Sequence, residues 1–145
     1  MNTIKKSVTN DTLLQVVGAQ TTAVSAAGTV DGSAVIIDLG VGVQNDNLVL
    51  SLDVSAITVD DTDEEYVISL QGSNSATFAD TNEILGQLVL GAAAANALRS
   101  TDSATGRYSI VCSNYNNATV YRYVRVYISV AGTTPSITIS SAYLS

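Results

Sequence analysis

The sequence contains no histidine and no tryptophan, and it has one cysteine, one proline and one phenylalanine among its 145 residues. Histidine is the commonest general base and metal ligand of proteins, so its absence argues against most catalytic and metal-binding arrangements. The lone Cys112 has no second sulfur with which to form an intrachain disulfide or complete a zinc cluster. It lies in a strand-like segment and is expected to be a buried, inert thiol. We therefore predict a chain that is not an enzyme and that holds no metal or cofactor.

Positive charge is missing from most of the chain. No lysine or arginine occurs between Ser7 and Leu98, a stretch that holds twelve of the thirteen acidic residues, and the formal net charge is −7. From Arg99 onward four arginines face Asp102 alone, which predicts a weakly basic patch on an acidic molecule. Nucleic-acid binding requires several clustered cations that displace counterions from phosphates. Nucleic acid is therefore not an expected partner.

Long apolar segments are lacking as well. The longest one, residues 84–98, is interrupted by two glycines, a glutamine and an asparagine, and it is shorter than the roughly 20 residues that cross a bilayer. Lys5 and Lys6 are followed by polar residues at the place where a signal peptide carries its apolar segment. We expect neither a membrane partner nor a secretion signal.

What the chain does contain is a series of short runs in which apolar and polar residues alternate. Residues 48–54 place four apolar side chains on one face at a period of two, which is typical of a half-buried strand. Residues 66–71 repeat the pattern and end at the turn-forming residues 72–75. Six further strand candidates are separated by glycine, asparagine, aspartate and serine: residues 21–27, 34–39, 84–90, 108–112, 119–130 and 136–143.

These segments predict an all-β protein of about eight strands. The four alanines at residues 92–95 favour at most a turn or two of helix. Many short strands with closely spaced turns are typical of a two-sheet antiparallel β-sandwich, and both a jelly-roll and an immunoglobulin-like topology remain open. Residues 1–12 are polar and aperiodic, so we expect an extended N-terminal arm followed by a single domain over residues 13–145.

An acidic run lies just before one predicted strand. Five of the six residues from Asp60 to Glu65 are acids. Its spacing differs from that of the EF-hand loop, and it lacks the glycine of that motif. We therefore interpret the run as a solvated loop and keep calcium binding as the alternative.

The segment 119–130 is the most informative for function. In one continuous strand its valines and isoleucine would face the core, and Tyr121, Tyr123, Arg125 and Tyr127 would share the opposite face. Tyrosine and arginine are enriched at interface hot spots, because both bury a large area and keep a polar end for a hydrogen bond. The pattern predicts either an intermolecular protein contact or cross-strand packing of the tyrosines beneath a loop or helix of the same chain.

Several segments together resemble a known family. Residues 66–73 and 76–80, the strand from Tyr121 to Tyr127, and residues 130–133 are similar to the capsid cement (decoration) proteins of tailed bacteriophages, and the resemblance covers about residues 33–144. In that family a loop containing phenylalanine follows such a strand. A strand of aromatic residues and arginine, followed by an Ala-Gly-Thr turn, closes the sandwich near the C-terminus.

The resemblance implies a viral structural protein made in the host cytoplasm and located on the outer capsid surface of the virion. There it would bind the major capsid protein and stabilise contacts between capsid subunits, and it would form a homotrimer. Two other classes remain open from the residues: a carbohydrate-binding or adhesin module, and another virion β-sandwich such as a tail or head-fibre protein. In carbohydrate-binding sites the sugars commonly stack on exposed aromatic rings, and this sequence has no tryptophan and one phenylalanine.

Overall fold

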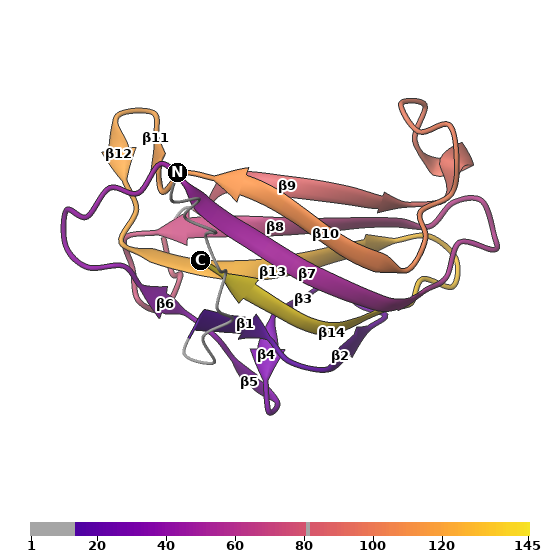
Figure 1. Ribbon diagram of the computed structural model, residues 1–145, viewed down its shortest axis with the longest axis horizontal. Coiled ribbons are helices and arrows are strands. Elements are labelled where there is room, and N and C mark those ends of the chain that lie inside the picture. Colours follow the sequence, from indigo (N-terminus) through magenta and orange to yellow (C-terminus); the bar gives the residue numbers. More distant parts are fainter. Residues whose placement is uncertain (1–13, 81) are drawn as a thin grey trace, which may run out of the picture.

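The computed structural model describes residues 14–80 and 82–145, which form two antiparallel β-sheets packed face to face (Figure 1). This confirms the all-β sandwich predicted from the sequence. The expected N-terminal arm, residues 1–12, lies outside the described residues. The alanine-rich segment forms a 3-10 turn, η2 (Ala93–Ala95), and the described chain has no helix long and apolar enough to cross a membrane.

The first sheet lies in front in Figure 1, and its strands have the order β10–β7–β14, with β1 and β2 following each other along β14. The bounds of its strands are β1 (Gln15–Val17), β2 (Gln20–Thr22), β7 (Leu48–Ile57), β10 (Gly106–Cys112) and β14 (Ile137–Leu144). The central strand β7 alternates between buried and more exposed residues over its first seven positions, as predicted from its apolar period of two.

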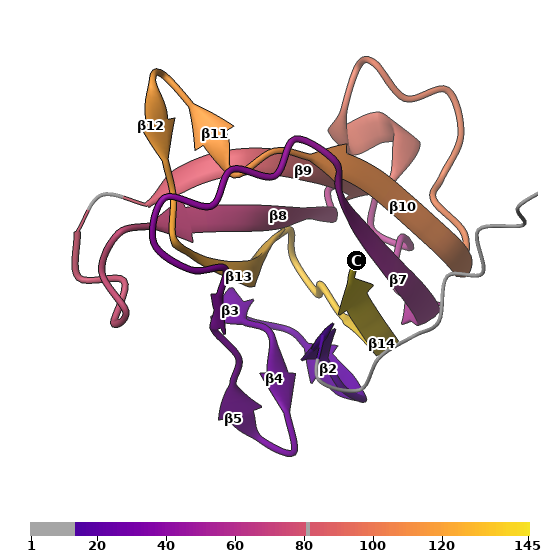
Figure 2. The same cartoon turned by 60° about the vertical axis from the view of Figure 1, so that its left-hand side comes forward.

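The second sheet has the order β9–β8–β13, with β3 and β6 both pairing with β13. Its strands are β3 (Ala26–Ala27), β6 (Ile37–Asp38), β8 (Glu65–Ser73), β9 (Glu83–Gly91) and β13 (Tyr123–Ala131). Two small hairpins project from the sandwich, β4–β5 and β11–β12 (Figure 2). Their bounds are β4 (Thr29–Val30), β5 (Ser33–Ala34), β11 (Tyr115–Asn116) and β12 (Thr119–Val120).

The strand order decides between the two topologies that the sequence left open. When β1 and β2 are counted as one broken strand and β3 and β6 as another, eight strands build the two sheets. In chain order the first sheet then contains strands one, eight, three and six, and the second contains strands two, seven, four and five. This arrangement is a jelly roll.

Three expected strands are wrong in their extent. The segment 21–27 is not one strand, because the chain passes from the first sheet to the second between β2 and β3. The segment 34–39 contributes only β6 to the second sheet. The segment 119–130 breaks between β12 and β13, since the backbone N–H and C=O of Tyr121 both bond to Asn114 and Tyr121 leaves the ladder.

The core lies between the sheets and consists of inward side chains from both. Among the fully buried residues are Leu50, Leu52, Ile68, Leu70, Val126, Ile128, Ile137 and Ile139. Burying an aliphatic side chain of this size contributes about 1.5–3 kcal/mol. Cys112 is 3% exposed, and a Cβ atom on Gly86 would lie only 2.4 Å from its sulfur. Burial raises the pKa of this thiol to about 11, and its low exposure confirms the prediction that Cys112 is buried.

One buried hydroxyl joins two connections at the same end of the sandwich. The Tyr66 side chain is fully buried, and its hydroxyl donates to the Thr58 carbonyl at 2.7 Å. The same oxygen accepts the backbone N–H of Ser136 at 2.8 Å. Tyr66 therefore ties the β7–β8 and β13–β14 connections to the core.

Candidate functional site

Three of the four predicted contact residues share one face. Tyr123, Arg125 and Tyr127 alternate along β13 with the buried Val124 and Val126, so they point away from the core on the outer face of the second sheet. All three are half-buried. We call Tyr123, Arg125 and Tyr127 the tyrosine face.

Tyr121 does not belong to that face, contrary to the sequence prediction. A Cβ atom built on Gly72 would lie 2.9 Å from Cβ of Tyr121. Gly72 is paired with the fully buried Val124, so that position points toward the core. Tyr121 therefore packs on the inner side of the second sheet, and Val120, also expected in the core, is half-buried in β12. The alternation fails because the strand breaks at this point.

Arg125 already has partners within the chain. Its guanidinium lies 4.2 Å from the centre of the Phe78 ring and 5.5 Å from that of Tyr127, and its Nε donates to Gln71 Oε1 at 3.0 Å. Phe78 is 7% exposed and lies in the connection after β8 with a φ of 53°. Arg125 is therefore packed within the chain, and the alternative of cross-strand tyrosine packing beneath a loop or helix stays a prediction. An intermolecular contact through the half-buried Tyr123 and Tyr127 stays a prediction.

A second candidate surface, not found from the sequence, lies at one end of the sandwich. Three segments meet there, residues 39–47, 74–80 and 113–122, on the left in Figure 1. We call them together the loop end. The fully buried Asn114 joins two of these segments: its Oδ1 accepts the N–H of Asn45 at 2.6 Å, and its Nδ2 donates to the carbonyls of Val43 and Tyr121 at 2.7 and 2.9 Å. Such a satisfied buried amide gives the connections one defined arrangement.

Exposed apolar side chains gather at or next to the loop end. Val41 is 79% exposed and Val43 49% exposed in the connection before β7, and Tyr115 is 43% exposed in the β11–β12 hairpin. Val111, Ile84 and Ile36 are also exposed, and each stands near the strand end that adjoins these loops. Exposed apolar groups collected in one region commonly mark interaction sites. In the sequence, the feature that could have indicated this surface is the pair Val41 and Val43 among glycine, glutamine and asparagine residues.

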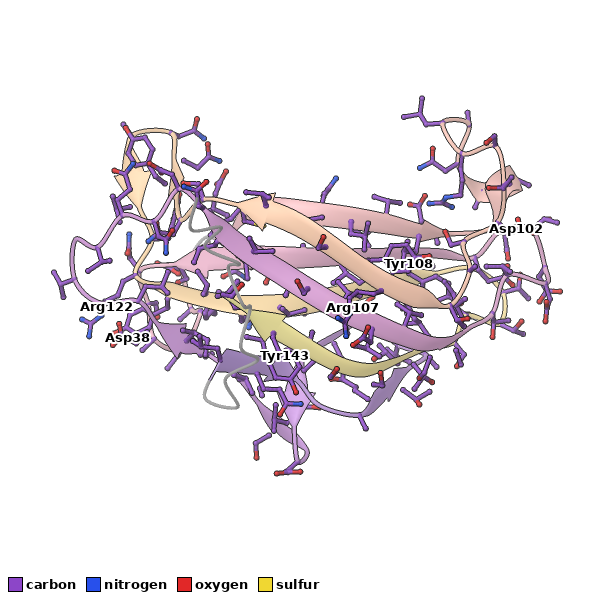
Figure 3. All side chains as sticks on the ribbon, viewed as in Figure 1. Asp38, Asp102, Arg107, Tyr108, Arg122 and Tyr143 are labelled. Carbon is purple, nitrogen blue, oxygen red and sulfur yellow. The ribbon has the colours of Figure 1, made fainter. Side chains whose placement is uncertain are left out.

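The arginines do not form the basic patch expected from the sequence. Arg107 on the first sheet bonds to Asp53 at 2.9 Å, and Arg122 at the loop end bonds to Asp38 at 2.7 Å (Figure 3). Hydrogen bonds from Arg122 lower the pKa of Asp38 to about 2. In the described residues the arginines are thus spread over both sheets and a loop, and two of them are neutralised by neighbouring carboxylates.

The acidic run has partners of its own. Asp63 accepts hydrogen bonds from the N–H and hydroxyl of Thr133, which lower the pKa of its carboxyl. Asp61 accepts from the Thr134 hydroxyl, and the buried Glu64 carboxylate accepts the N–H of Asp61. Over residues 14–80 and 82–145, no three histidine, cysteine, aspartate or glutamate side chains converge as metal ligands would. The run holds the β13–β14 connection in place.

Comparisons with known proteins assign this chain to no family. No family model and no curated protein matches the chain. One solved structure with detectable similarity is a mutant xylanase from Cellvibrio japonicus in complex with xylopentaose. The match has 14% identity and a TM-score of 0.44, and it covers 90% of this chain but 22% of that chain. A similarity of this size carries no conclusion about what the present chain binds.

Proposed function

We propose that this chain is a structural protein that binds the outer surface of a tailed-phage capsid and stabilises contacts between major capsid subunits. The observation that carries the proposal is the loop end, where exposed valines and Tyr115 stand on connections fixed by the buried Asn114. Fixed apolar groups bind a protein surface with little further loss of conformational entropy. The resemblance of residues 66–73, 76–80, 121–127 and 130–133 to cement proteins supports a capsid as that protein surface.

The stabilising mechanism is the thermodynamic linkage between binding of this protein and assembly of the shell. A protein that binds the assembled shell and not its dissociated subunits shifts the equilibrium toward the shell by mass action. It needs no catalytic group for this, only an interface that spans neighbouring subunits. A homotrimer, as the resemblance implies, would present three loop ends and three tyrosine faces at once, so that binding is multivalent.

Purified heads of the encoding phage, stripped of this protein, provide the test. We expect saturable binding at a fixed copy number per shell and a higher temperature of shell disruption. Val41→Asp should weaken binding at least about tenfold, a loss of about 1.4 kcal/mol that is typical of an interface residue. Val24→Asp is the matched control, because Val24 is 77% exposed but lies in the β2–β3 connection at the other end.

The tyrosine face is tested separately in the same assay. Tyr123→Ala should cost more than about 0.5 kcal/mol of capsid or self affinity if this side chain lies in a contact. A smaller effect would return the tyrosine face to internal packing. Binding to a glycan array with no affinity for heads would instead favour the carbohydrate-binding alternative.

A further inference from the structure

The two sheets have four edges, and three of them are interrupted or charged. β1 and β2 form one edge in pieces of three residues, and β3 and β6 form another in pieces of two. β10 carries Arg107 near its beginning, and this side chain pairs with Asp53. Short, broken or charged edge strands are the usual means by which proteins prevent unwanted strand pairing.

The fourth edge, β9, lacks most of this protection. It is nine residues long, and after Glu83 it contains no charged residue. Its ladder with β8 has one irregularity, beyond which Gly86 to Gly91 pair in regular register. On the open side only Gly91 bonds within the described chain, to Ser103. The outward N–H and C=O groups from Gly86 to Leu90 therefore meet no partner in the described chain.

The surroundings of this edge limit what can approach it. In Figures 1 and 2 the β11–β12 hairpin rises beyond β9 at one end, and the connection between β9 and β10 rises beyond it at the other. A partner that pairs along β9 therefore lies between these two projections.

A small pocket adjoins the regular part of the edge. It has a volume of about 250 Å³ and is lined by Val89, Asn96, Leu98 and Arg99. Ligand sites usually measure about 300–1,000 Å³, so this pocket suits one side chain more than a small-molecule ligand. Val89 and Leu98 are its apolar lining residues, and Leu98 is 98% exposed. Glu83 is the first residue of β9 and Asp102 lies in the connection that follows β9, in a described chain that has twelve acids and four arginines.

We propose that β9 accepts an extended segment of a partner protein as an added antiparallel strand. Main-chain hydrogen bonds to Gly86–Leu90 supply the affinity, and one apolar side chain of the segment enters the pocket beside Val89. The segment is uncharged at its centre and basic at its ends, which complements Glu83, Asp102 and the acidic surface. This activity goes beyond the proposed capsid function and does not depend on it.

A peptide assay without capsids tests the proposal. The probe is the acetylated, amidated heptapeptide Lys-Thr-Val-Thr-Val-Thr-Lys, titrated into the full chain and followed by amide hydrogen exchange in NMR spectra. We expect saturable binding with new protection confined to residues 86–90. The same peptide N-methylated at its three central residues cannot pair on either edge, and it should bind at least about tenfold more weakly, the loss of roughly one hydrogen bond's net contribution or more.

Two variants sharpen the result. Val89→Lys places a cation in the pocket and should weaken binding of the unmodified peptide about tenfold or more. Val24→Lys places the same change in the β2–β3 connection, where Val24 is 77% exposed, and should leave binding unchanged. Absence of protection on β9, equal binding of the N-methylated peptide, or protection on β10 would each overturn the proposal. Concentration-dependent protection of β9 without peptide would show that a second copy occupies the edge, which also contradicts it.

Discussion

Replacing Tyr66 by phenylalanine removes one oxygen from the core and leaves the ring in place. The hydroxyl accepts a hydrogen bond from the Ser136 N–H at 2.8 Å and donates one to the Thr58 carbonyl at 2.7 Å. The Tyr66 side chain is 0% exposed. A buried donor or acceptor left without a partner costs about 1–3 kcal/mol. We expect Tyr66→Phe to lower the free energy of unfolding by about 2 kcal/mol, which for a domain of this size lowers Tm by roughly 4–8 °C.

Tyr108→Phe is the matched control, because it makes the same chemical change at the surface. The Tyr108 hydroxyl donates to the Ala104 carbonyl at 2.6 Å in an exposed position, where water replaces the lost partner (Figure 3). Its effect should stay within about 0.5 kcal/mol. Urea unfolding of the three proteins gives both free energies, with an unchanged slope against urea if the unfolded states are alike. Equal losses in the two variants would refute the reasoning that burial of the hydroxyl sets the cost.

Two further predictions concern the loop end. Asn114→Ala removes three hydrogen bonds from a buried site and should lower the free energy of unfolding by about 2–4 kcal/mol in urea titrations, whereas Asn47→Ala, at an exposed position, should be nearly neutral. Because Arg122 lowers the pKa of Asp38 to about 2, the stabilisation from this pair is complete above the ordinary aspartate pKa near 4 and is lost as the pH falls through about 2. A plot of Tm against pH between 4 and 2 should be flatter for Asp38→Asn, and an unchanged slope would contradict the assignment.

The long strands with alternating apolar and polar residues were predictable from the sequence, because this alternation depends only on which side chains face the core. Residues 48–54 and 66–71 lie in strands close to their expected places, and the all-β sandwich follows from them. The break at Tyr121 was not predictable, since it depends on Asn114, whose partners Val43 and Asn45 lie about seventy residues earlier in the chain. The loop end was missed for the same reason: single exposed valines have no periodicity, and only the fold brings their loops together.

The pairing of β7 with β14 has a consequence for synthesis of the chain. These two strands are central neighbours in the first sheet, yet Leu50 pairs with Leu144 and Ile57 with Ile137. Contacts of such long sequence separation require a costly loop closure, so folding is slow compared with proteins built from local contacts. On the ribosome, β7 is made early and has no β14 beside it until nearly all the described chain has been synthesised. Until then the edge of β7 that later pairs with β14 is open to other chains, and aggregation competes with folding during this interval.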